Sequence, residues 1–170
     1  ESITGIVFRN KAGKLIKTPP RARLVDIDNI APPAWDIIPI HDYLDRGFGF
    51  GVSRGRPMPI IASRGCPYQC TFCSSPFMWT TRWVIRDPDL LLDEMEKFMS
   101  QYGATNFDFY ELTFVIKKQW VIDFCQKLEE RGLNITWQLP GGTRSESIDS
   151  EVAYWLYRSG CRNMTYTPES

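Results

Sequence analysis

The chain has 170 residues, 43% of them hydrophobic, and its 20 basic residues balance 20 acidic ones. That composition argues against intrinsic disorder, and the zero net charge gives no sign of a nucleic-acid surface or a polybasic membrane patch. No apolar run approaches the roughly 20 residues that a membrane-spanning helix needs, and the N-terminus lacks the profile of a signal peptide. We therefore expect a cytoplasmic protein.

The first part of the chain, residues 1–57, predicts a β-hairpin followed by an irregular linker. Two short apolar runs in GIVFRN-KAG-KLIKT, residues 5–18, are joined by a turn that contains glycine. A proline-rich stretch with no clear periodicity follows over residues 19–44. We interpret residues 1–57 as a segment that joins the rest of the chain to an upstream domain.

Alternating strands and helices are predicted from residue 58 onward. The first long helix is expected over residues 88–102, where Asp87 can cap the N-terminus and Gly103 suits the end. Such units imply parallel strands joined by right-handed crossovers, so the predicted fold class is α/β, a partial TIM-type (βα) barrel with about four parallel strands over residues 58–170. The expected strands cover residues 57–63, 106–110, 134–139 and 162–168, and two further helices cover residues 117–132 and 147–160.

Three of the five cysteines, Cys66, Cys70 and Cys73, lie close together in ASRGCPYQCTFC. An odd, clustered set does not suit a disulfide framework, and a structural zinc site usually has four Cys or His ligands, whereas the single histidine, His41, lies far upstream. A 4Fe-4S cluster normally takes four thiolates, so three would leave one iron open to another ligand. The spacing of the three cysteines also fits one buried face of a helix, but Gly65, directly before the first cysteine, disfavours a helix there.

Charged residues follow the later predicted strands at the same edge of the sheet as the cysteines. In parallel α/β folds, ligands bind at the C-terminal ends of the strands. Glu111, Arg144 and Glu169 each come shortly after such an end, so we expect them to face the cysteine loop.

The motif CPYQCTFC, with an aromatic residue before its last cysteine, resembles the signature of the radical S-adenosylmethionine superfamily. The resemblance implies that Cys66, Cys70 and Cys73 hold a 4Fe-4S cluster and that S-adenosylmethionine chelates the fourth iron. Reductive cleavage then gives a 5′-deoxyadenosyl radical, with electrons from a reductant of the flavodoxin or ferredoxin type. It also implies that Phe72 lies near the adenine, and that the three charged residues named above lie near the methionine or ribose.

Further segments resemble superfamily members that carry an upstream cobalamin-binding domain. These are the linker, FYELTF, WQLPGGTRSESID and SGCRNMTYTPES. The resemblance implies a cobalamin-dependent methyltransferase or a related enzyme, with cobalamin bound by a domain outside this chain, because no DxHxxG motif surrounds His41. The family's barrel has six strands, so we expect a fragment that binds its cofactors without full turnover.

Two other functions fit the same cysteines. One is an electron-transfer or structural iron-sulfur protein that takes its fourth ligand from a partner. The other is a zinc-binding module that uses Asp or Glu as the fourth ligand. The response of a bound cluster to S-adenosylmethionine separates the enzyme from both.

Overall fold

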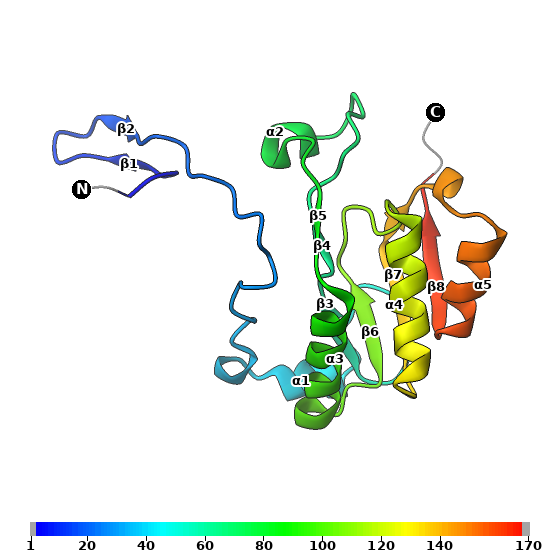
Figure 1. Ribbon diagram of the computed structural model, residues 1–170. Coiled ribbons are helices and arrows are strands. Elements are labelled where there is room, and N and C mark those ends of the chain that lie inside the picture. Colours follow the sequence, from blue (N-terminus) through cyan, green and yellow to red (C-terminus); the bar gives the residue numbers. More distant parts are fainter. Residues whose placement is uncertain (1–2, 168–170) are drawn as a thin grey trace.

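A four-stranded parallel sheet forms the centre of the computed structural model, which describes residues 3–167 (Figure 1). The helices α3, α4 and α5 connect successive strands and cover one face of the sheet. This arrangement confirms the predicted parallel α/β fold with crossover helices. In sheet order the strands are β3 (Pro57–Ile60), β6 (Asn106–Phe109), β7 (Thr136–Thr143) and β8 (Cys161–Tyr166), and the helices are α3 (Pro88–Tyr102), α4 (Lys118–Glu130) and α5 (Ser150–Arg158).

Local signals set the ends of α3. The Asp87 side chain accepts hydrogen bonds from the backbone N–H groups of Asp89 and Leu90, which have no partner within the first helical turn. Gly103 takes the left-handed conformation, with φ of 64°, and its N–H closes the last turn on Met99. The helix therefore begins and ends at the predicted residues.

The core lies between the sheet and the three helices. Its centre is a group of fully buried rings, in which Phe109 meets Phe114 and Trp137 edge to face at 5.1 and 5.3 Å between ring centroids. Such tilted pairs are the favoured geometry for aromatic rings. Phe124 of α4 joins the same group, so this cluster fixes α4 against β6 and β7.

The predicted first strand is divided in two. It leaves the sheet after Ile60, and a short strand β4 (Ser63–Arg64) then pairs antiparallel with β5 (Val84–Ile85). Between them lie the cysteines and a short helix, α2 (Ser75–Trp79), which the sequence did not predict. Figure 1 shows β4 and β5 continuing beyond the end of β3, with α2 at the far end. We call residues 63–85 the cysteine arm.

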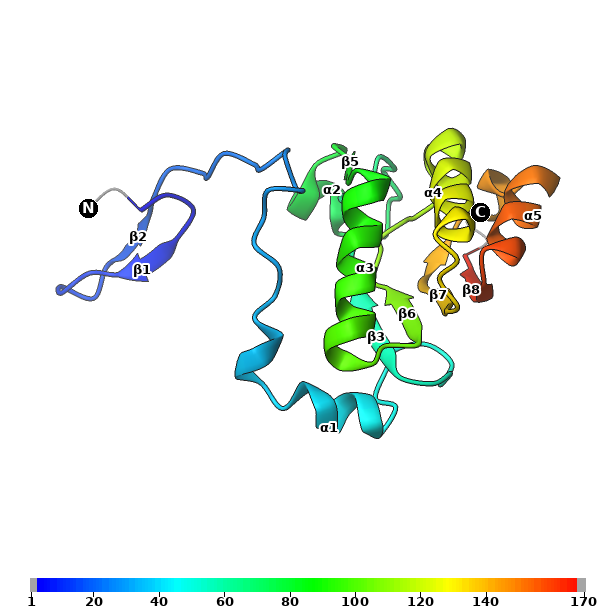
Figure 2. The same cartoon turned by 60° about the horizontal axis from the view of Figure 1, so that its bottom comes forward.

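The N-terminal hairpin lies apart from the sheet in two views (Figures 1 and 2). Its strands, β1 (Val7–Arg9) and β2 (Leu15–Lys17), pair as predicted, with Phe8 opposite Ile16. The stretch that follows is less irregular than expected, because it contains a 3-10 turn, η1 (Trp35–Ile37), and a helix, α1 (Ile40–Asp45). Ile40 and Leu44 lie one helical turn apart and are both buried in the core, which holds this helix in place.

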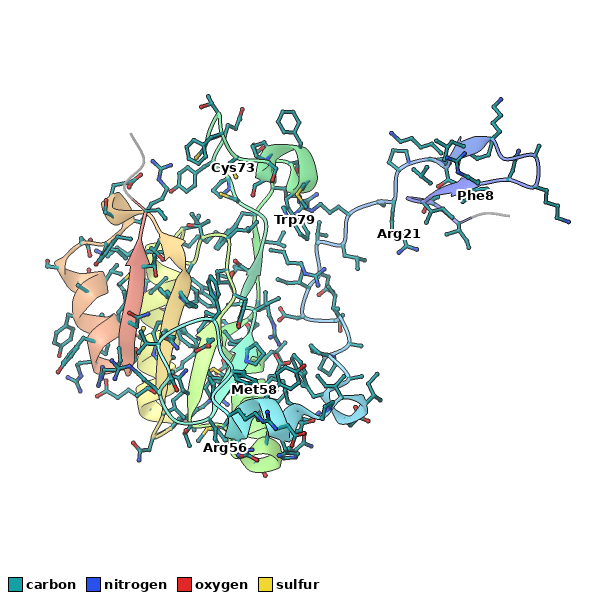
Figure 3. The ribbon with its side chains drawn as sticks, turned by 180° about the vertical axis from the view of Figure 1, so that it is seen from behind. Phe8, Arg21, Arg56, Met58, Cys73 and Trp79 are labelled. Atoms are coloured by element: carbon teal, nitrogen blue, oxygen red, sulfur yellow. The ribbon has the colours of Figure 1, made fainter. Side chains whose placement is uncertain are left out.

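A glycine-rich loop, residues 46–56, crosses the face of the sheet that the helices leave open, as the view from behind shows (Figure 3). The side-chain amide of Gln138 donates to the carbonyl of Val52 and accepts from its N–H, both at 3.0 Å. The same amide donates to Asp108 at 2.6 Å. Buried polar side chains of two strands thus hold the loop.

Among residues 3–167, none of the helices has the length and apolar character of a membrane span.

Candidate functional site

The three clustered cysteines lie in the loop between β4 and α2, and each is partly exposed. The N–H of Cys73 donates to the carbonyl of Cys70 at 3.0 Å, and the N–H of Ser75 points to the Cys73 sulfur at 3.4 Å. Figure 3 shows Cys73 at the far end of the arm, well beyond Met58 in the sheet. The loop is therefore held out past the C-terminal end of β3, as the parallel fold predicted.

The cysteines interact electrostatically. Burial raises the pKa of the Cys66 thiol, and the neighbouring Cys70 and Cys73 raise it further, while the N–H of Tyr68 and the positive charge of Arg144 lower it. Three soft thiol donors on one loop fit an iron-sulfur cluster by their chemistry. In residues 3–167, however, no three Cys, His, Asp or Glu side chains already stand in a metal-binding arrangement.

The remaining Cys and His residues lie elsewhere. Cys125 and Cys161 are buried in the core, where burial raises both thiol pKa values to about 12. His41 lies on α1, where its ring is 5.8 Å from that of Tyr102 and its Nδ1 is 3.3 Å from a nitrogen of Arg56. None of these three residues lies in the cysteine loop, and the zinc alternative, which takes Asp or Glu as the fourth ligand, does not depend on them.

Arg144 reaches the cysteine loop from the end of β7. Its guanidinium lies 4.2 Å from the centre of the Tyr68 ring, and one of its nitrogens is 3.9 Å from the Cys70 sulfur. Glu146 forms an ion pair with the same guanidinium. The structure thus brings together two segments that sequence reasoning had placed at one edge of the sheet. Tyr68 was not predicted, although it lies within the cysteine motif.

Of the other predicted site residues, Phe72 is exposed to solvent and Glu169 is not among the described residues. Phe72 is 77% exposed, so its ring is available to a ligand. Glu169 lies outside the described residues. Contact of either residue with S-adenosylmethionine stays a prediction.

Glu111 lies at the base of the arm, and only 6% of it is exposed. Its carboxylate accepts hydrogen bonds from the N–H groups of Ala62 and Ser63 and from the Ser63 hydroxyl. Burial raises its pKa to about 7, against the lowering effect of these bonds and of the nearby Arg86. Its predicted contact with the methionine group remains untested.

Sequence reasoning missed Arg86, which links three parts of the chain. Its guanidinium donates to Asp28 of the linker at 3.2 Å, to the carbonyl of Ile61 at 3.3 Å, and to Glu94 of α3. The only sequence signal was its position, directly before the residue that caps α3 and directly after β5. Such a residue must lie where the arm returns to the main body.

No family model matches the chain. Among curated proteins, it is 29% identical to an uncharacterized methyltransferase of Pyrococcus horikoshii over 170 residues, which is all of this chain and 35% of that protein. It is 30% identical over 135 residues to an anaerobic magnesium-protoporphyrin IX monomethyl ester cyclase of Rubrivivax gelatinosus, which is 79% of this chain and 23% of the cyclase. The chain therefore spans between 23% and 35% of the length of these relatives.

Solved structures share the fold. The cobalamin-dependent S-adenosylmethionine radical enzyme OxsB, with aqua-cobalamin and S-adenosylmethionine bound, matches with a TM-score of 0.71 at 18% identity, over 98% of this chain and 24% of that one. The radical S-adenosylmethionine methyltransferase TsrM of Kitasatospora setae, with cobalamin and a [4Fe-4S] cluster bound, matches with a TM-score of 0.64 at 19% identity, over 95% of this chain and 32% of that one. The chain therefore shares the α/β fold of these cobalamin-binding radical S-adenosylmethionine enzymes, which confirms the resemblance at the level of the fold.

Proposed function

We propose that residues 58–170 are the cofactor-holding part of a radical S-adenosylmethionine enzyme, in which Cys66, Cys70 and Cys73 hold a 4Fe-4S cluster. The observation that carries the proposal is the meeting of two segments. Three partly exposed cysteines stand past the end of the first parallel strand, and Arg144 reaches their loop from the end of the third. Ligands of parallel α/β folds bind at this edge.

When bound, the cluster and S-adenosylmethionine would supply the one-electron cleavage that yields a 5′-deoxyadenosyl radical. The chain supplies the ligands and their electrostatic setting. The positive charge of Arg144 lowers the pKa of the Cys66 thiol and so favours the thiolate, which is the form that binds iron. The ring of Tyr68 holds that charge in place by a cation–π contact. The exposed ring of Phe72 offers a flat apolar face for the adenine.

The whole protein, we further propose, is a cobalamin-dependent methyltransferase or a related cyclase. The relatives named above support this by kind, since they are methyltransferases and a cyclase. Residues 1–57 would join the chain to a cobalamin-binding domain. A flavodoxin or ferredoxin would supply the electron, which places the enzyme in the reducing cytoplasm.

Anaerobic reconstitution with iron and sulfide tests the proposal. We expect about one 4Fe-4S cluster per chain by iron and sulfide analysis, and a changed electron paramagnetic resonance spectrum of the reduced cluster when S-adenosylmethionine is added. Cys70→Ala should lose the cluster, and Cys125→Ala, a buried cysteine far from the loop, should keep it. If the spectrum of the cluster does not change when S-adenosylmethionine is added, the protein is an electron carrier. If the chain binds zinc but no iron, it is a zinc module.

A further inference from the structure

The cysteine arm joins the sheet through a short bend, Ile61–Ala62, between β3 and β4. The last backbone bond between β3 and the neighbouring strand segment runs from the N–H of Tyr110 to the carbonyl of Ile60 at 3.0 Å. Beyond it the two chains separate. Ala62 at this bend is buried whereas Ile61 is 44% exposed, and the buried backbone groups need other partners because an unpaired one is costly.

Side chains take over where the strand pairing stops. The Glu111 carboxylate accepts from the N–H groups of Ala62 and Ser63 and from the Ser63 hydroxyl. Glu111 directly follows Tyr110 in the chain, so its side chain continues the pairing of the two strands where the backbone bonds stop. A carboxylate that accepts several N–H and O–H groups holds them more firmly than a neutral acceptor does.

Arg86 completes the bend from the other side. Its backbone N–H donates to the carbonyl of Ala62 at 2.9 Å, and its guanidinium donates to the carbonyl of Ile61 at 3.3 Å. Its positive charge also favours the ionised form of Glu111. These polar groups of the bend are thus divided between Glu111, which uses its side chain, and Arg86, which uses its backbone N–H and its guanidinium.

We propose that Glu111 is a positioning residue that sets the angle of the cysteine arm on the sheet. Ser63, which Glu111 binds, precedes Cys66 by three residues, and the opposite wall of the site is Arg144, directly after β7. A fixed angle keeps the cysteines and this arginine together. Loss of the carboxylate frees the bend and lets the cysteine loop move away from β7. The consequence for a cluster rests on the proposed function, whereas the anchoring itself does not.

Two variants and one control test this role. Glu111→Ala removes the acceptor, and Glu111→Gln keeps the size and an oxygen for the two N–H groups but removes the charge. Asp108→Asn is the matched control. Asp108 is a buried acid on β6, three residues before Glu111 and 2% exposed, and its carboxylate accepts hydrogen bonds from Asn106 and Gln138.

The first readout uses the chain without metal. Hydrogen exchange at the amides of Ala62 and Ser63 should rise about tenfold or more in Glu111→Ala, which loses the acceptor, and by less in Glu111→Gln, which loses only the charge. The thiols of Cys66, Cys70 and Cys73 should react faster with a disulfide reagent. Asp108→Asn should change neither property under native conditions, where these amides exchange through local opening of the bend. Where Glu111→Ala fails to fold, Glu111→Gln and Ser63→Ala, which deletes one bond, carry the test.

The second readout is iron retained per chain after anaerobic reconstitution, with the spectrum of the reduced cluster. Reduced retention or a shifted spectrum in the Glu111 variants alone supports the positioning role. Unchanged exchange at Ala62 and Ser63 overturns it. If exchange and thiol reactivity change but the unaltered chain binds no iron, the anchoring role stands and the proposed function fails.

Discussion

Gly51 should not tolerate a side chain, because the loop of residues 46–56 packs directly on Gln138. A Cβ atom at position 51 would lie 2.3 Å from Cδ of Gln138 and 2.4 Å from both polar atoms of its amide, distances that no relaxed contact reaches. The φ angle of Gly51 is not in the positive region, so alanine meets no backbone penalty there. Any loss of stability in Gly51→Ala is therefore steric.

The size of the loss follows from the bonds at stake. If the loop withdraws, the two bonds between Val52 and Gln138 break, at roughly 1 kcal/mol each. If Gln138 moves instead, its bonds to Asp108 and Asn163 break as well, and a buried acceptor without its partner costs about 1–3 kcal/mol. We expect Gly51→Ala to lower the free energy of unfolding by about 2–4 kcal/mol, out of the 5–15 kcal/mol typical of a domain.

Urea unfolding, followed by circular dichroism, measures this loss. Gly132→Ala is the control, because its φ of 63° lies in the left-handed region but no atom lies within 4 Å of its Cβ position; it should cost about 1 kcal/mol through backbone strain alone. Adding Gln138→Ala to Gly51→Ala should cost less than the sum of the two single changes, because they remove the same contact. A Gly51→Ala protein within about 0.5 kcal/mol of the original would refute this account.

Three further outcomes follow from the structure. Arg144→Ala should raise the pKa of the Cys66 thiol, because the positive charge of the arginine lowers it. The Cys66 thiol should then react more slowly with a disulfide reagent at pH 8. An unchanged or faster rate would contradict the contact. The pKa of Glu111 is raised from 4.5 to about 7, so the native state binds more protons than the unfolded state between these pH values. The free energy of unfolding should therefore fall by up to about 3 kcal/mol between pH 4.5 and pH 7. Glu111→Gln should lack that part of the pH dependence in urea titrations. Phe124→Ala, in the centre of the core, should cost about 3–5 kcal/mol, whereas Phe77→Ala, 92% exposed, should leave the urea midpoint unchanged; similar losses for both would argue against the described core.

The elements governed by nearby residues were predictable from the sequence. The ends of α3 follow from Asp87 and Gly103, which act on the backbone beside them. The edge at which Arg144 meets the cysteines follows from the parallel topology, which is a rule about strand ends rather than about particular contacts. The contact with Tyr68 required the actual path of the loop.

Features that depend on distant partners were not predictable. The break after Ile60 arises because Glu111, 49 residues beyond Ala62, takes the hydrogen bonds that would have continued the strand. The path of residues 46–56 depends on Gln138, and a glycine-rich segment carries no periodicity that could reveal it. The sequence therefore predicted the features that depend on neighbouring residues and not those that depend on residues far apart in the chain.

The glycine-rich loop also bears on the order in which the molecule folds. Val52 and Gln138 are 86 residues apart, so the loop cannot take its final place until β7 has joined the sheet. Contacts between such distant residues form late, because closing a long stretch of chain costs entropy before any bond repays it. The loop therefore waits for a strand that follows it in the chain, and its glycines keep it flexible in the meantime.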